Sequence, residues 1–114
     1  MLVDSHCHLD FPDFSAELDA VVERARSAGI GRIVTISTRV KKFDQLIDIT
    51  NRYDDIFCSV GTHPHNADQE LDIHTDDLCR LAEHPKCVGI GEAGLDYYYD
   101  NACLLYTSPS PRDA

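Results

Sequence analysis

Two alternating histidines, His6 and His8, lie in the segment Asp-Ser-His-Cys-His-Leu-Asp at residues 4–10. An apolar opening precedes them, so this segment is a predicted first strand, on which side chains two positions apart point to the same face. The two imidazoles would then project side by side, about 6–7 Å apart. This spacing suits two nitrogen ligands of one divalent metal ion, with Asp4 on the same face. The alternative is a pair of ordinary exposed or core histidines, because short motifs also occur by chance.

Two later segments carry further residues of this kind, each directly after an apolar run. His63 and His65 belong to Gly-Thr-His-Pro-His at residues 61–65, and Glu92 follows Val-Gly-Ile-Gly. We predict Glu92 to be a metal ligand and a catalytic residue, because its two oxygens can bridge the two divalent ions of a phosphoryl displacement. The alternative for Glu92 is an acid in the first turn of a helix. His63 and His65 could ligate a metal, donate to a phosphate oxygen or order their loop.

Other polar residues near these segments are expected to have structural roles. Asp96 and the tyrosines at 97–99 are expected to shape the rim of the site, since tyrosines pack their rings and hydrogen-bond at the tip. Cys7 lies between the two histidines but would point to the opposite face, which argues against a nucleophilic role. The sequence has no Gly-rich phosphate loop and no nucleophile elbow.

The elements that must position these residues follow a repeating order of strand and helix. Ser15 and Thr38 are the expected N-caps of the first and second helices, and Gly29 is expected to end the first helix. Strands are predicted to begin near residues 2, 32, 56 and 87, and helices are predicted over residues 15–28, 38–53 and 72–84. Units of about 25–31 residues are the size expected of right-handed parallel crossovers. The pattern predicts an α/β fold with a parallel sheet, and periodicity alone does not decide between an open sheet and a barrel.

The predicted strand ends bring the three groups of candidate residues to one place. In parallel α/β barrels the active site gathers at the carboxyl ends of the strands. The candidates follow the first, third and fourth predicted strands. We therefore predict a shared metal site at one rim of the sheet.

Length and composition favour one small cytoplasmic domain. The chain has 114 residues, 43% of them hydrophobic and 26% charged, as is usual for globular proteins. No run approaches the roughly 18 apolar residues of a membrane span, and the pattern of a secretory signal is absent. Five cysteines without a CxxC pair favour reduced thiols over a disulfide framework. The net charge of −10 argues against extensive duplex binding but allows a nuclease whose contacts are local and metal-assisted.

Residues 4–10, 61–65 and 91–97 together resemble the motifs of the TatD family of metal-dependent hydrolases, in the family's order and spacing. The resemblance covers residues 1–101 and implies the N-terminal half of a TIM-like (β/α)8 barrel of the amidohydrolase type. It also implies a DNase, a phosphodiesterase with two divalent ions (Mg, Mn or Zn) that acts on DNA, often from the 3′ end. Carried over by position, His6 and His8 hold one metal and Glu92 bridges the two. His63 matches a residue that contacts substrate phosphate, and His65 is assigned to substrate binding with it.

The last part of the chain departs from this family. Family members supply two further histidines and an aspartate from later strands, and continue with a helix that Pro109 and Pro111 forbid here. Residues 102–114 are therefore expected to be a non-native tail, and the chain a truncated, inactive fragment of the enzyme. A homodimer that closes a barrel from two halves is the less favoured alternative. Two functional alternatives stay open. The first is a metal-dependent deacylase or amidohydrolase, because a His-x-His strand serves carbonyl substrates equally well. The second is an inert metal-binding fragment.

Overall fold

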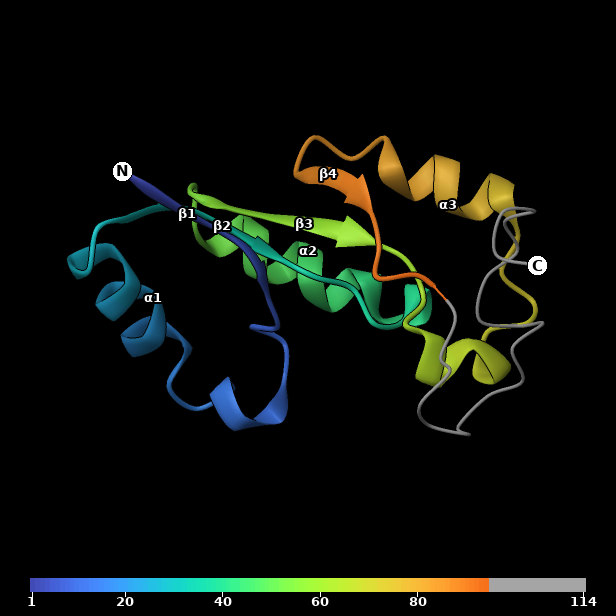
Figure 1. The fold of residues 1–114 in the computed structure, drawn as a ribbon, viewed down its shortest axis with the longest axis horizontal. Coiled ribbons are helices and arrows are strands. Elements are labelled where there is room, and N and C mark those ends of the chain that lie inside the picture. The colour runs from blue at the N-terminus through green and yellow to red at the C-terminus, as the bar shows by residue number, and fades with distance from the viewer. Residues whose placement is uncertain (95–114) are drawn as a thin grey trace.

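The computed structural model describes residues 1–94 of the chain, in which strands and helices alternate (Figure 1). The strands are β1 (Leu2–Cys7), β2 (Ile30–Thr35), β3 (Ile56–Val60) and β4 (Cys87–Ile90). The α-helices between them are α1 (Leu18–Ser27), α2 (Phe43–Arg52) and α3 (Thr75–Ala82). A short 3-10 helix precedes each α-helix, namely η1 (Pro12–Phe14), η2 (Val40–Lys42) and η3 (Pro64–Gln69).

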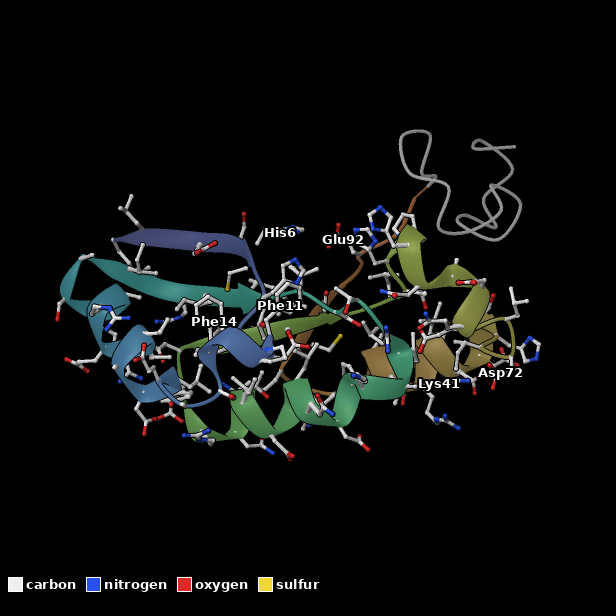
Figure 2. The ribbon with its side chains drawn as sticks, turned by 90° about the horizontal axis from the view of Figure 1, so that it is seen from below. His6, Phe11, Phe14, Lys41, Asp72 and Glu92 are labelled. Atoms are coloured by element: carbon white, nitrogen blue, oxygen red, sulfur yellow. The ribbon has the colours of Figure 1, made fainter. Side chains whose placement is uncertain are left out.

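The four strands form one parallel sheet in the order β1-β2-β3-β4. Figure 2 shows the strands along one side of the molecule and the α-helices along the other. Each strand pairs with the next one in the chain, so the order of the strands in the sheet is their order in the sequence. The helices lie on one face of the sheet. This arrangement is the N-terminal half of a TIM-like barrel, as the family resemblance of the sequence implies.

Two apolar clusters hold the helices against the sheet. The first joins α1 to the strands and is centred on Val22 and Ile56, both fully buried. The second joins α2 and α3 to β3 and includes Leu46, Cys58 and Val60. In β3 the core residues alternate along the strand, so Ile56, Cys58 and Val60 face the helices. The opposite face carries Ser59, which lies next to the candidate site.

The helices begin later than the sequence predicts, and both proposed N-caps are wrong. The Ser15 hydroxyl donates to the Pro12 carbonyl oxygen at 2.9 Å inside the turn that ends η1, and α1 starts at Leu18. The Thr38 carbonyl oxygen accepts the His63 N–H at 2.8 Å, which holds Thr38 at the rim of the sheet, and α2 starts only after η2. Gly29 ends α1 as predicted, with a φ of 93° that favours glycine.

The remaining boundaries differ by a few residues. Strand β2 ends at Thr35, so Ser37 lies in the loop beyond it. Helix α3 begins at Thr75, where the predicted helix over 72–84 starts earlier. The cause is local, since the Asp77 carboxylate accepts the His74 N–H at 2.9 Å and closes a capping box there.

Candidate metal centre at the carboxyl ends of the strands

The end of β1 presents two imidazoles on one side and a thiol on the other. The Cys7 Sγ lies 3.6 Å from the Val34 carbonyl oxygen and packs against the core, so His6 and His8 take the opposite side. Their ring centroids are 5.2 Å apart at an interplanar angle of 82°. Burial, followed by the charges of Asp4 and Asp10, raises the pKa of the Cys7 thiol to about 12. That value agrees with the prediction that Cys7 is no nucleophile.

His8 is oriented by two neighbours. Its Nδ1 lies 3.1 Å from the Ile36 carbonyl oxygen, and its ring stacks on Phe11 with centroids 4.6 Å apart. A carbonyl oxygen only accepts hydrogen bonds, so Nδ1 carries the proton. The lone pair of Nε2 therefore faces outward from this anchor, which is the tautomer that a metal-binding histidine requires.

Buried serines at the ends of β2 and β3 place Glu92. The Glu92 N–H donates to the Ser37 carbonyl oxygen at 2.9 Å, and the Ser59 hydroxyl donates to the Gly91 carbonyl oxygen at 2.8 Å. The Ser59 oxygen also accepts the Ser37 N–H at 3.0 Å. These serines were not singled out from the sequence. They could have been identified as polar residues at the ends of otherwise apolar strands, because a buried hydroxyl there needs a hydrogen-bond partner.

Gly61 allows the backbone before Glu92 to come close to β3. A Cβ at position 61 would lie 2.6 Å from the Gly91 carbonyl carbon and 2.8 Å from the Glu92 carbonyl oxygen. The Gly61 carbonyl oxygen in turn accepts the Ser37 hydroxyl at 2.7 Å. The third strand thus contributes close backbone packing as well as histidines to the site.

The structure brings His6, His8 and Glu92 together. Glu92 Oε2 lies 3.5 Å from the Nε2 atoms of both His6 and His8. One potential ligand atom from each of the three residues lies within 4.8 Å of the others. Figure 2 shows His6 and Glu92 at the same end of the sheet.

His63 holds the other oxygen of the same carboxylate. Its Nε2 lies 3.2 Å from Glu92 Oε1, and its Nδ1 accepts the His65 N–H at 3.0 Å. Because Nδ1 accepts this hydrogen bond, the proton of a neutral imidazole is on Nε2, the atom that contacts Glu92. The His65 ring packs edge-on against His63 with centroids 4.4 Å apart. His63 therefore orients the carboxylate, and His65 lies one step further from the cluster.

The three residues of this metal centre fit a divalent ion. Glu92 Oε2 is buried and has no hydrogen-bond donor among residues 1–94, while the His8 Nε2 lone pair is free to face it. Two acceptors facing each other repel unless a cation or a proton lies between them. Ligands held at about 2.1 Å around a tetrahedral ion lie about 3.4 Å from one another, close to the separations seen here. The donor set of two nitrogens and one oxygen is typical of zinc and similar ions.

Some predicted participants are placed elsewhere. The Asp4 carboxylate accepts the His6 N–H at 3.1 Å and is not part of the cluster. Asp96, the tyrosines at 97–99 and the tail at 102–114 lie outside the described residues. The assignments of His6, His8 and Glu92 to metal, of Glu92 to catalysis, and of His63 and His65 to substrate stay predictions.

Comparisons with known proteins point to one family. The family model described as TatD related DNase matches residues 3–105. The chain is 33% identical over 101 residues to the uncharacterized metal-dependent hydrolase YjjV of Escherichia coli, covering 87% of this chain and 39% of that protein. It is 31% identical over 96 residues to the 3'-5' ssDNA/RNA exonuclease TatD of Salmonella typhimurium, covering 84% of this chain and 37% of that protein.

A solved structure agrees with these sequence matches. The crystal structure of YjjV, a TatD homolog from Escherichia coli, superposes with a TM-score of 0.69 at 31% identity. The match covers 88% of this chain and 39% of that one. The chain thus spans about two fifths of the length of the curated relatives it matches. Among the described residues, no helix is long and apolar enough to cross a membrane.

Proposed function

The chain belongs to the TatD related DNase family, and we propose that the protein it represents is a divalent-metal-dependent phosphodiesterase that removes nucleotides from the 3′ end of DNA. The observation that carries this proposal is Glu92 Oε2, which is buried without a hydrogen-bond donor among residues 1–94 and lies 3.5 Å from two imidazole nitrogens at the carboxyl ends of parallel strands. The name of the Salmonella relative, a 3'-5' exonuclease for single-stranded DNA and RNA, supports the choice of substrate and of direction.

Each residue of the metal centre has a distinct part in this proposal. His6, His8 and Glu92 would hold a divalent ion, which supplies Lewis acidity at a phosphoryl oxygen and a more nucleophilic water. Glu92 would be the catalytic carboxylate, and its two oxygens would allow it to ligate two ions. His63 Nε2 lies 3.2 Å from Glu92 Oε1 and would orient that oxygen, and we assign His63 and His65 to substrate binding. We propose two ions of Mg, Mn or Zn, of which the second requires ligands beyond these three.

The proposed location is the cytoplasm. Cys7, Cys58, Cys79 and Cys87 are free thiols in the structure, as expected in a reducing compartment. The proposed partner is DNA. Because the chain has a net charge of −10, we expect it to bind DNA through a few contacts near the metal and not through a broad basic surface.

The test uses single-stranded oligonucleotides labelled at the 5′ or 3′ end and the product of the gene's full reading frame. With Mg²⁺, Mn²⁺ or Zn²⁺ we expect the 5′-labelled strand to shorten stepwise, and EDTA to stop the reaction. Glu92→Gln should lower the rate at least about a hundredfold, the cost of losing one catalytic charge contact. Glu83→Gln, an exposed carboxylate at the end of α3, is the matched control and should leave the rate unchanged.

Two outcomes would contradict the proposal. Hydrolysis of amide or acyl substrates without cleavage of DNA would identify a deacylase or amidohydrolase. Metal binding without hydrolysis of either substrate class would leave a metal-binding protein that is no enzyme.

A further inference from the structure

A hollow of about 430 Å³ lies beside the metal centre, between η1, η2 and η3. Its lining includes Phe11, Arg39, Lys42, His63 and Asn66. His63 contacts Glu92 as well, so the hollow and the metal centre share one residue. A molecule that reaches the metal centre from this side must pass over the hollow.

Two cations lie in this hollow although the chain as a whole is acidic. Arg39 is half-buried and makes one side-chain hydrogen bond within the described chain, from Nη2 to Asn66 Oδ1 at 3.3 Å. A guanidinium has five N–H donors, so most of them are available to a ligand. Lys42 is exposed and makes no ion pair with any residue of the part that the structure describes. Arginine and lysine together are a typical pair for a phosphate group.

The loop that carries these cations is held by a buried carboxylate. Glu70 is 5% exposed and accepts the N–H groups of Val40 and Lys41 at 2.7 and 2.8 Å. It also accepts the Thr62 hydroxyl at 2.5 Å, which ties the loop to the segment that carries His63. Arg39 and Lys42 therefore flank a turn whose backbone is held in place before a ligand binds.

Lys41 lies between the two cations in sequence but points elsewhere. Its Nζ pairs with Asp72 at 2.9 Å, and Figure 2 shows both residues well away from Glu92. It is not among the residues that line the hollow. The turn thus directs two of its positive charges to the hollow and the third to the outside.

An exposed aromatic ring forms the side of the hollow nearest the metal centre. Phe11 is 40% exposed, with one ring face stacked on His8 at an interplanar angle of 12°. An exposed phenylalanine next to a phosphate-binding pair is typical of sites for single-stranded nucleic acid, where bases stack on aromatic rings. Asp10 also lines the hollow, with its Oδ1 buried, and its carboxylate interacts electrostatically with Lys42.

We propose that this hollow binds the nucleotide next to the cleaved phosphodiester of single-stranded DNA, with its phosphate on Arg39 and Lys42 and its base on Phe11. The proposal rests on the proposed function for the choice of DNA. It adds three residues, none of them a metal ligand, that set the path of the strand into the metal centre.

The experiment measures binding of a fluorescein-labelled oligothymidylate to the 114-residue chain by fluorescence anisotropy, in EDTA and at several salt concentrations. EDTA removes divalent ions, so the measured affinity reports the chain's own side chains. Arg39→Gln and Lys42→Gln should each weaken binding several-fold and lower the slope of log affinity against log salt concentration by about 0.7, as expected for one lost phosphate contact. Lys41→Gln removes the same charge from the adjacent position and should leave both quantities unchanged.

The aromatic contact is tested by its own pair of variants. Phe11→Leu should weaken binding at least about fivefold, and Phe11→Trp should retain it, because stacking depends on the ring and tolerates a change of aromatic residue. Far-UV circular dichroism of each variant is the check that it keeps the wild-type fold.

Three results would overturn the proposal, namely an equal loss in Lys41→Gln, an unchanged affinity in Phe11→Leu, and no binding by the wild-type chain in EDTA. If the complete protein degrades DNA while this binding is absent, the hollow is wrongly assigned and the proposed function stands. If the oligonucleotide binds as expected but no metal ion supports cleavage, the proposed function fails and the hollow remains a DNA-binding site.

Discussion

Glu92 Oε1 lies 3.2 Å from His63 Nε2, whereas Glu92 Oε2 lies 3.5 Å from the Nε2 atoms of both His6 and His8 and has no hydrogen-bond donor among residues 1–94. The two oxygens therefore have different tasks. The contact of Oε1 with His63 fixes the orientation of the carboxylate, whereas Oε2 needs a positively charged partner. This asymmetry is the most specific indication of a metal site at the level of single residues.

The first prediction concerns the charge of this carboxylate. Glu92→Gln replaces a charged oxygen by a neutral amide of the same shape, so the affinity for Zn²⁺ or Mn²⁺ should fall by more than about tenfold. Isothermal titration calorimetry of the 114-residue chain measures this change. Glu83→Gln should bind as the wild type does. Equal affinities of Glu92→Gln and the wild type would place the metal elsewhere.

The residues of the candidate site differ in how far the sequence could predict them. His6 and His8 could be predicted because their spacing matches the repeat of a strand, and Glu92 because glycines flank it at a strand end. Ser37, Ser59 and Gly61 could not, since their importance comes from contacts between the ends of different strands. Such contacts have no fixed spacing in the sequence.

At the scale of elements, the strands could be predicted and the helix starts could not. Strands β2 and β3 are rich in the β-branched and aromatic residues that are typical of strands. A helix start depends on which group satisfies its first N–H donors. In η2, which leads directly into α2, this group is the carboxylate of Glu70, which is 30 residues away from Val40 in the chain. A candidate cap nearby in sequence, Thr38, therefore has no capping role.

The second prediction concerns the link between the strand ends. Ser59→Ala leaves two buried groups, the Ser37 N–H and the Gly91 carbonyl oxygen, without this partner. The free energy of unfolding should fall by about 1–3 kcal/mol, and metal affinity about tenfold, because Glu92 loses its support. Urea unfolding and calorimetry measure the two effects.

Ser27→Ala, at the exposed end of α1, is the control for this change and should alter neither quantity. A loss of stability in Ser59→Ala without a loss of metal affinity would show that Ser59 supports the sheet but does not position Glu92.

The third prediction concerns the ion pair that joins α1 to the turn before β3. Arg26 contacts Asp55 through two hydrogen bonds, 2.9 and 2.8 Å long, and the guanidinium lowers the pKa of the Asp55 carboxyl. A lowered native pKa stabilises the fold above the unfolded value of about 4 and loses this effect as pH falls through the native value. Thermal unfolding should show Asp55→Asn less stable than the wild type at pH 7, with the difference disappearing near pH 2–3. A difference that does not change with pH would assign the effect to packing instead of charge.

At the scale of the whole molecule, the sheet has one covered face and one open face. Helices cover the first, whereas Val88 and Ile90 of β4 are 58 and 59% exposed on the second. They line a hollow of about 410 Å³ together with His6, Ser59 and Glu92. In a closed barrel this face is filled by layers of side chains. The candidate metal centre therefore lies at the edge of a surface that a complete barrel would bury.

The fourth prediction follows from this open face. Exposed apolar side chains next to unpaired strand edges favour association between copies, so the 114-residue chain should sediment as a concentration-dependent mixture of monomer and larger species. Replacing both Val88 and Ile90 by threonine keeps the β-branched shape but lowers the apolar area, and should shift the mixture towards monomer. Leu71→Thr removes a side chain that is 54% exposed outside this sheet and should leave the distribution unchanged. If Leu71→Thr dissociates the larger species and the double variant does not, the contact surface lies on the helical side of the molecule.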